Sequence, residues 1–272
     1  MPSTTVITTP QLSRLVGLPD TPLLVDVRTE EDFTTDRRVI PGSRRRDFST
    51  VATWAHEYAG RDVVVSCARG GKLSQGAAAW LRTAGARAES LEGGFNAWRE
   101  AGQPLLEFDR VPPIGADDRT VWVTRARPKV DRIACPWLIR RFVDPGARFL
   151  FVTPADVAGV AERFHATPFD VEGVYWSHRG DGCTFDTMVE EFGLRSDALD
   201  RLSVIIRGAD TARTELAPQA AGVLAALLGF SRMYRDDLEQ LEAALPFLDA
   251  LYRWSRDAVE ETHNWPLPRA SA

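Results

Sequence analysis

The residue types with the clearest chemical potential lie in one short segment around a cysteine. In the stretch VVVSCARGGKLS, a run of β-branched residues ends at Cys67, and Gly70 and Gly71 follow before a helix-like stretch. Glycine adopts backbone conformations closed to other residues, so this loop can curl until its N–H groups point inward. With Arg69, Lys72 and the N-terminus of the following helix, these N–H groups would surround the sulfur with positive potential. We therefore expect the loop to stabilise a thiolate, a persulfide or a bound oxyanion.

The spacing of the cations narrows the interpretation of this loop. Lys72 follows the cysteine by five residues, whereas phosphatase loops carry an arginine at the sixth position, where this chain has Leu73. The backbone of Ala68, Gly70 and Gly71 would then form a tighter ring than a phosphatase loop does. The alternative is a buried structural cysteine at the end of a strand, since free cysteine is among the most buried residue types.

Several charged residues near this loop are expected to support the fold. Asp26 ends a second apolar run and is expected to accept hydrogen bonds that hold neighbouring loops. Arg28 is expected to pair with an acid such as Glu31 or Asp32. The run at 44–46, three arginines, is typical of a solvated face; the alternative is that it guides an anionic substrate.

A second cysteine lies in a basic segment further along the chain. Cys135 precedes Pro136, which fits the first turn of a helix, so its thiol is predicted at or beside a helix N-terminus, where a thiolate is favoured. Asp131 and Arg132 share this segment and are further candidate site residues. A local excess of cations could bind a small dianion. The cations are Arg125, Arg127, Lys129, Arg132, Arg140, Arg141 and Arg148. The alternative is a solvated helix with one buried cysteine.

A third group of residues resembles half of a transition-metal site. His178 and Cys183 are five residues apart in a glycine-containing loop, and Asp186 follows near a helix start. Candidates for the remaining ligands are Cys135, Asp131, Asp210 and Asp236. Arg207 and Asp210 end a predicted helix with paired charges and are further candidates of the second half. Alternatively, His178 orients a catalytic acid or caps a helix.

The first half of the chain must position Cys67 through alternating strands and helices. The runs at 23–27 and 62–67 are short and rich in β-branched residues, a pattern typical of strands buried on both faces of a parallel sheet. Helix-like stretches separate and follow them, at 10–15, 29–36, 50–58, 74–83 and 95–100. This alternation predicts an α/β layer fold. A ligand would bind at the carboxyl ends of the strands, where Asp26 and Cys67 fall.

The chain divides at a segment without periodicity. Residues 108–118, FDRVPPIGADD, are predicted as a linker between a domain at 1–107 and a domain at 119–272. The second domain is predicted to be a mainly helical α+β fold. Its predicted strands are 120–124, 148–152 and 173–176, and its predicted later helices are 197–207, 218–230 and 237–256. The helix at 218–230 is apolar nearly all round, which predicts burial, and Pro246 should kink or split the last helix.

Composition excludes several classes of function. A chain of 272 residues, of which 44% are hydrophobic, is long enough for two packed domains. The net charge of −5 argues against direct nucleic-acid binding, which needs a basic surface. Neither a secretory signal nor a membrane-spanning run is visible, so a soluble cytoplasmic protein is expected. There the three cysteines, which form no CxxC motif, would be separate thiols.

Three ordered motifs make the first domain resemble a rhodanese-like sulfurtransferase. They are DVR at 26–28 with IPG at 40–42, CARGGK at 67–72, and LEGGFNAW at 91–98. The resemblance implies that Cys67 accepts a sulfane sulfur as a persulfide from a thiosulfate-like donor. It would then pass this sulfur to a thiol or another thiophilic acceptor, with no cofactor required. Val39 stands in place of a usual histidine and Lys72 in place of a commoner arginine, and because lysine grips an oxyanion less firmly, weak activity is expected.

The second domain, over residues 120–256, resembles the C-terminal domain of ChrB-type chromate-resistance proteins. The matching segments are 130–141, 177–178 with 183–186, 207–211 and 216–222. This resemblance implies a part in chromate resistance by sensing, binding or reduction. The leading hypothesis is a cytoplasmic sulfurtransferase fused to this domain. The alternatives are a non-catalytic sensor of chromate or another oxyanion, and a metal-dependent enzyme centred on His178, Cys183 and Asp186.

Overall fold

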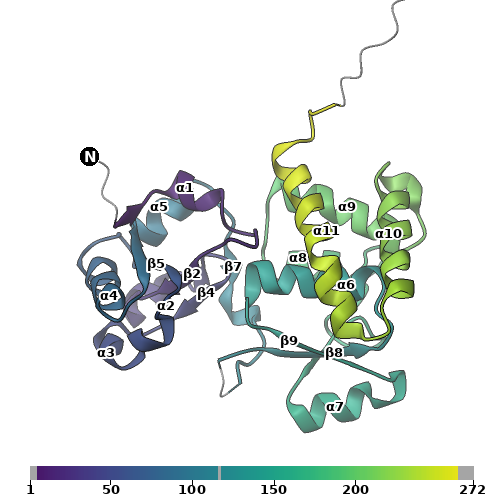
Figure 1. The fold of residues 1–272 in the computed structure, drawn as a ribbon, viewed down its shortest axis with the longest axis horizontal. Coiled ribbons are helices and arrows are strands. Elements are labelled where there is room, and N and C mark those ends of the chain that lie inside the picture. The colour runs from purple at the N-terminus through teal and green to yellow at the C-terminus, as the bar shows by residue number, and fades with distance from the viewer. Residues whose placement is uncertain (1–4, 116–117, 263–272) are drawn as a thin grey trace, which may run out of the picture.

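The chain folds around two separate parallel sheets, each covered by its own helices (Figure 1). The computed structural model describes residues 5–115 and 118–262. Residues 1–4, 116–117 and 263–272, which belong to the predicted first domain, linker and second domain, lie outside the described residues. Within the part of the chain that is described, no helix has both the length and the apolar character that crossing a bilayer requires.

The first sheet has five strands, all parallel, in the order β1-β6-β5-β2-β4. Its strands are β1 (Val6–Ile7), β2 (Leu23–Asp26), β4 (Ser43–Arg45), β5 (Asp62–Ser66) and β6 (Arg87–Leu91). The flanking helices are α1 (Thr9–Ser13), α2 (Glu30–Thr35), α3 (Val51–Trp54), α4 (Lys72–Thr83) and α5 (Gly94–Glu100). Strands β3 (Arg38–Val39) and β7 (Leu106–Glu107) form a separate antiparallel pair. The predicted parallel sheet with flanking helices is confirmed.

The register of the two central strands brings the predicted site residues to one edge. Strands β2 and β5 are neighbours, and Asp26 pairs with Ser66, the residue before Cys67. Both strands are buried, as their β-branched sequences predicted, and the loop that follows β5 leads directly into α4. Asp26 and Cys67 therefore both lie at the carboxyl edge of the sheet.

The second sheet is smaller, with three parallel strands in the order β10-β8-β9. Its strands are β8 (Val121–Arg125), β9 (Arg148–Val152) and β10 (Thr167–Pro168). Helix α7 (Val157–Phe164) packs on this sheet, and the other helices gather on its far side (Figure 1). These are α6 (Val130–Leu138), α8 (Thr184–Glu191), α9 (Asp197–Asp210), α10 (Ala220–Met233) and α11 (Asp237–Asp257). The mainly helical character that the sequence predicted is confirmed.

Three local predictions for this half are wrong. Residues 173–176 form no strand; Trp176 makes only an isolated bridge with Phe169. Helix α10 is buried on one face only, and Met233 is 70% exposed, because α9 and α11 cover just that face. Helix α11 runs unbroken through Pro246, since the apolar stripe that it buries outweighs the roughly 3 kcal/mol that an internal proline costs.

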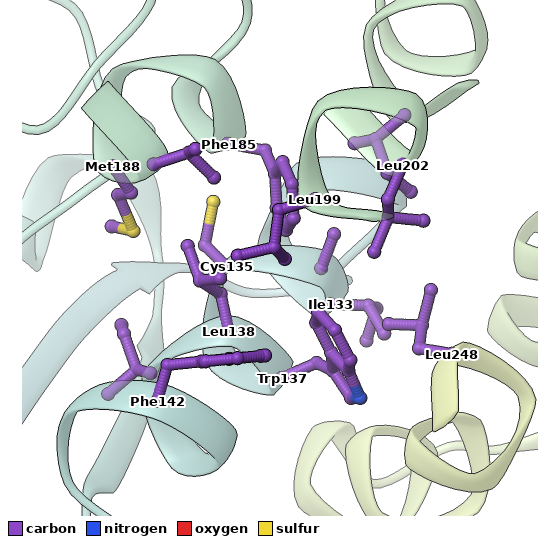
Figure 2. Close-up of a cluster of buried hydrophobic side chains, with 14 of the residues drawn as sticks. Ile133, Cys135, Trp137, Leu138, Phe142, Phe185, Met188, Leu199, Leu202 and Leu248 are labelled. Carbon is purple, nitrogen blue, oxygen red and sulfur yellow. The ribbon is translucent and has the colours of Figure 1, made fainter. Parts of the chain in front are cut away.

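The prediction that Cys135 lies at a helix N-terminus is also wrong. Helix α6 begins at Val130, so that both Cys135 and Pro136 lie inside it. Its first turns are buried in the core, and this burial moves the helix start ahead of the proline. Figure 2 shows the sulfur of Cys135 among apolar side chains, near Phe185 and Met188 of α8. Burial raises the pKa of this thiol, so it remains protonated.

The two halves of the chain share one hydrophobic core. Phe33, Val39 and Leu106 of the first half belong to the same buried cluster as the apolar residues of α6. Two backbone hydrogen bonds cross between the halves, from Gly42 to Phe142 and from Glu107 to Phe192. The halves are therefore packed together rather than merely tethered.

The arginines at 44–46 do not form a solvated face as predicted. Arg44 lies 3.1 Å from Asp118 and 3.4 Å from Asp144, and Arg46 lies 2.7 Å from Asp118. Arg45 instead covers the ring of Phe33 and pairs with Glu30. Strand β4 ends against the segment that opens the second half, so these guanidinium groups meet carboxylates there instead of water.

Candidate functional site

The loop after β5 is held in a curl by the beginning of α5. The carbonyl oxygens of Cys67 and Ala68 accept hydrogen bonds from the N–H groups of Phe95 and Asn96, at 2.9 and 3.0 Å. These carbonyls point toward α5, and N–H groups of the loop point toward the sulfur of Cys67. The first turn of one helix thus anchors the loop that precedes another.

The sulfur of Cys67 lies inside this curl and is surrounded by hydrogen-bond donors. Its thiol is buried, with the residue 5% exposed. Burial alone would raise the pKa of Cys67, but the Ser74 hydroxyl and the N–H groups of Ser74, Arg69 and Gly71 together lower it below its ordinary value. The Ser74 oxygen lies 3.2 Å from the sulfur. The loop therefore favours a sulfur anion, as a helix N-terminus and an amide cradle should.

Two glycines permit this close packing. Gly70 and Gly94 both have positive φ, at 65° and 61°. A Cβ atom on Gly94 would overlap the carbonyl oxygen of Cys67, and one on Gly70 would overlap the backbone at Leu91 and Gly93. Gly70 and Gly94 are thus needed so that the cysteine loop can sit directly on α5.

The cysteine loop carries two cations. Arg69 and Lys72 are exposed, and neither forms an ion pair within the described part of the chain. Lys72 is the first residue of α4, with Gly71 as the N-cap. The guanidinium and ammonium groups are therefore available to an anion that approaches Cys67 from solvent.

Asp26 and Arg28 form a buried structural pair at the same sheet edge. Asp26 accepts hydrogen bonds from the backbone and side chain of Arg28, the shortest at 2.6 Å. Arg28 also donates to the carbonyls of Asp36 and Arg38 and stacks on Phe95, 3.8 Å from the ring centroid. Asp26 thus holds loops, as predicted, but the predicted partners of Arg28, Glu31 and Asp32, are wrong. The guanidinium of Arg28 already makes strong charge-assisted hydrogen bonds to Asp26, so it stays buried and does not turn toward the exposed acids.

A second cluster in the other half surrounds His178 with carboxylates. The Nε2 atom of His178 lies 3.1 Å from Asp210, 3.4 Å from Asp170 and 3.5 Å from Asp131. Asp131 lies in the first turn of α6, Asp210 is the last residue of α9, and Asp170 follows β10. Thr187 of α8 fixes the segment before His178 by donating to the carbonyl of Ser177 at 2.8 Å. Side chains from α6, from α9 and from the connection between β10 and α8 therefore meet at one imidazole.

Asp186 and Cys183, which the sequence grouped with His178, make other contacts. Asp186 accepts a hydrogen bond from the N–H of Cys183 at 2.9 Å and pairs with Arg207 at 3.0 Å, so it caps α8 and binds an arginine. Cys183 is fully buried, and burial raises the pKa of its thiol. The grouping of His178 with Cys183 and Asp186 is wrong, because the ligand atoms that gather with the imidazole belong to other residues. The thiol of Cys183 contacts Asp131 instead, and Asp186 binds Arg207. Of the other candidates, Asp131 and Asp210 do reach His178.

Sequence analysis missed Asp170, the third acid of this cluster. Its backbone is in the left-handed region, with φ of 52°, and its carboxylate lies 3.2 Å from Arg132 and 3.3 Å from Arg125. Arg132, a predicted site residue, therefore belongs to this cluster through its ion pair with Asp170. An aspartate at or just beyond the carboxyl end of a strand was the one available signal: Asp26 ends β2, and Asp170 lies two residues after β10. It was weak, because β10 has only two residues.

Two protein families match separate parts of the chain. Residues 8–101 match the rhodanese-like domain family, and residues 122–255 match the family described as ChrB, C-terminal domain. The chain thus contains a rhodanese-like domain followed by a ChrB C-terminal domain.

The second half is also similar to Protein ChrB of Cupriavidus metallidurans, with 39% identity over 132 residues. That match covers 48% of this chain, but it spans only 39% of the length of the relative.

Solved structures similar to this chain cover a little more than a third of it. A rhodanese-like domain protein from Staphylococcus aureus is 28% identical, with a TM-score of 0.31, over 35% of this chain and 90% of its own. A rhodanese-related protein from Thermoplasma volcanium is 23% identical, with a TM-score of 0.33, over 38% of this chain and 98% of its own.

Proposed function

We propose that the protein is a sulfurtransferase of rhodanese type that carries sulfur as a persulfide on Cys67. The observation that carries the proposal is the position of this sulfur, inside a curl of N–H donors that lowers its pKa. The thiolate is the nucleophilic form of cysteine, and a lowered pKa increases its population at neutral pH. No cofactor takes part in this chemistry.

Transfer proceeds in two balanced steps. The Cys67 thiolate attacks the outer sulfur of a thiosulfate-like donor; the sulfur–sulfur bond of the donor breaks, and sulfite leaves with the bonding electron pair. Cys67 then holds a persulfide anion, which the N–H groups of Arg69, Gly71 and Ser74 stabilise as they stabilise the thiolate. A thiolate acceptor attacks the outer sulfur, and Cys67 leaves as a thiolate. Arg69 and Lys72 attract the anionic donor at the mouth of the loop.

The ChrB C-terminal domain supports a role for this sulfurtransferase in chromate resistance, in the cytoplasm, where thiols stay reduced. Chromate is a tetrahedral dianion like the sulfonate end of thiosulfate, so the cradle that binds the donor would also bind chromate. We expect chromate to compete with thiosulfate in the transfer assay. Sulfate, of the same shape and charge, serves as the control for simple anion competition.

The direct test is mass spectrometry of the intact protein after exposure to thiosulfate. We expect a mass increase of one sulfur atom, located to Cys67 by peptide mapping and removed by a thiol acceptor. Cys67→Ser should abolish both the adduct and turnover, whereas Cys135→Ala should keep both. Full sulfur transfer by Cys67→Ser would refute the proposal. Saturable oxyanion binding without adduct or turnover would favour a non-catalytic oxyanion sensor instead.

A further inference from the structure

The carboxylates around His178 outnumber the lysine and arginine side chains that could balance their negative charge. Within residues 5–115 and 118–262, Asp170 pairs with Arg125 and Arg132, but Asp131 and Asp210 meet no lysine or arginine. All three acids instead converge on one imidazole nitrogen. Two of three converging carboxylates are thus without a permanent counter-ion.

Asp131 makes this imbalance acute, because its side chain is only 1% exposed. Its Oδ2 atom accepts hydrogen bonds from the N–H groups of Thr184 and Phe185 at the start of α8. Its Oδ1 atom is buried and accepts no hydrogen bond of normal geometry; the thiol of Cys183, a weak donor, lies beside this carboxylate. Leaving a carboxylate oxygen buried without a partner costs a protein several kcal/mol, so the arrangement calls for a ligand.

We propose that Asp131, Asp170 and His178, with Asp210 beside them, bind a first-row divalent cation of the Mn²⁺ or Fe²⁺ type. One ligand atom from each of the first three residues lies within 4.8 Å of the others. Two ligands of one such ion, each about 2.1 Å from it, lie at most about 4.2 Å apart, so only small side-chain movements are needed.

The donor set selects the class of metal. Carboxylate oxygens with a single imidazole suit Mn²⁺ and Fe²⁺, whereas sites for softer ions include thiolates. Cys183 lies close to Asp131, but its sulfur is not among the ligand atoms that gather within 4.8 Å of one another. The site is therefore an oxygen and nitrogen site, and its ion would supply the charge that the buried Asp131 lacks.

Hydrogen bonds around the ligands hold them in place. The Thr184 hydroxyl donates to Asp170 at 2.9 Å, and the N–H of Asp131 donates to Asp210 at 3.3 Å. Such outer partners orient metal-binding side chains. The side chain of His178 is 42% exposed, so the cluster is open to solvent on that side and coordination positions would be left for water. A bound ion would therefore join α6, α9 and the connection between β10 and α8, and it would remain accessible.

Titration of the full chain with Mn²⁺, followed by electron paramagnetic resonance, tests this proposal. Bound Mn²⁺ loses the six-line signal of the free ion, so the assay counts sites without any activity. We expect one site per chain in protein first freed of metal with a chelator. His178→Ala and Asp210→Asn should each weaken binding about tenfold or more. Mn²⁺ should also raise the Tm of the unsubstituted protein but not that of His178→Ala.

Matched controls separate this site from general acidity. His56→Ala removes an exposed histidine of the first half, and Asp181→Asn removes a carboxylate that is 97% exposed; both should bind Mn²⁺ normally. Cys67→Ser should also bind normally, because the metal site does not depend on sulfur transfer. The proposal is overturned if the unsubstituted protein binds no Mn²⁺, or if folded His178→Ala and Asp210→Asn bind it as tightly as the controls do.

Discussion

The Ser74 hydroxyl lies 3.2 Å from the Cys67 sulfur and, at the same distance, from the carbonyl oxygen of Gly71. A hydroxyl has one hydrogen, so it donates to only one of them at a time. When Cys67 is a thiol, its hydrogen can point to the Ser74 oxygen while the hydroxyl donates to Gly71. When Cys67 is a thiolate, the hydroxyl can turn to the sulfur. Ser74 thus serves both protonation states.

Ser74→Ala should raise the pKa of Cys67, because the hydroxyl is the largest of the contributions that lower it. The folded pKa is depressed, so the thiolate prevails at lower pH than in an unfolded chain. The pH profile of alkylation by iodoacetamide should shift to higher pH in the variant. At neutral pH, transfer should slow roughly tenfold, since a hydrogen bond to a charged group contributes about 1.5 kcal/mol. Ser49→Ala, at an exposed serine, should leave the profile unchanged.

Lys72→Arg should lower the KM for thiosulfate a few-fold, because a planar guanidinium can grip an oxyanion with two hydrogen bonds. Lys72→Ala should raise that KM, more strongly at low salt, where screening is weak. Both variants should keep the Tm of the parent protein, since Lys72 is exposed and forms no ion pair with a described residue. Steady-state kinetics at two ionic strengths checks this. An unchanged KM in both variants would remove Lys72 from donor binding.

Gly94→Ala should destabilise the protein by about 3 kcal/mol or more and abolish sulfur transfer. The new Cβ would overlap the Cys67 carbonyl, and a positive φ alone costs a non-glycine residue roughly 1–2 kcal/mol. Gly76→Ala in α4 is the matched control, because nothing lies within 4 Å of its Cβ. That variant should instead gain roughly 0.5–1 kcal/mol from helix propensity. Urea unfolding measures both effects.

Gly17→Ala should loosen the contact between the two halves. A Cβ at Gly17 would lie 2.5 Å from the ring of Phe142 and 3.0 Å from that of Tyr252, both in the second half. Gly60→Ala is the control: its φ of 73° is also positive, but its Cβ meets nothing within 4 Å. Proteolysis of the segment between the halves should speed up in the Gly17 variant beyond the change in the Gly60 variant. Equal rates would show that the contact does not hold the halves together.

Sequence patterns could predict the first sheet and the position of its site because the relevant signals are local. A β-branched run followed by a cysteine, two glycines and a helix specifies a strand, a loop and a helix N-terminus in one continuous stretch. The edge position of Asp26 follows from the same reasoning. The glycines of the LEGGFNAW motif could be recognised in the sequence. The packing of Gly94 against Cys67 could not, since the two segments are separated in the sequence.

Residues whose roles depend on distant partners could not be placed in this way. Proline suggested a helix start beside Cys135, but burial of the preceding residues moved that start to Val130. His178 and Cys183 are near each other in sequence, yet two of the three acids that meet the imidazole come from α6 and α9. Sequence spacing predicts ligand sets only when one loop supplies them.

The core that the halves share has a consequence for how this chain can be divided. Phe33, Val39 and Leu106 are buried against the second half, so a fragment ending near residue 107 would expose their apolar surfaces to water. Such a fragment would tend to self-associate, and heat should melt the intact chain in a single calorimetric transition rather than two. We therefore expect the rhodanese-like domain of this chain to unfold together with the second half, as one cooperative unit.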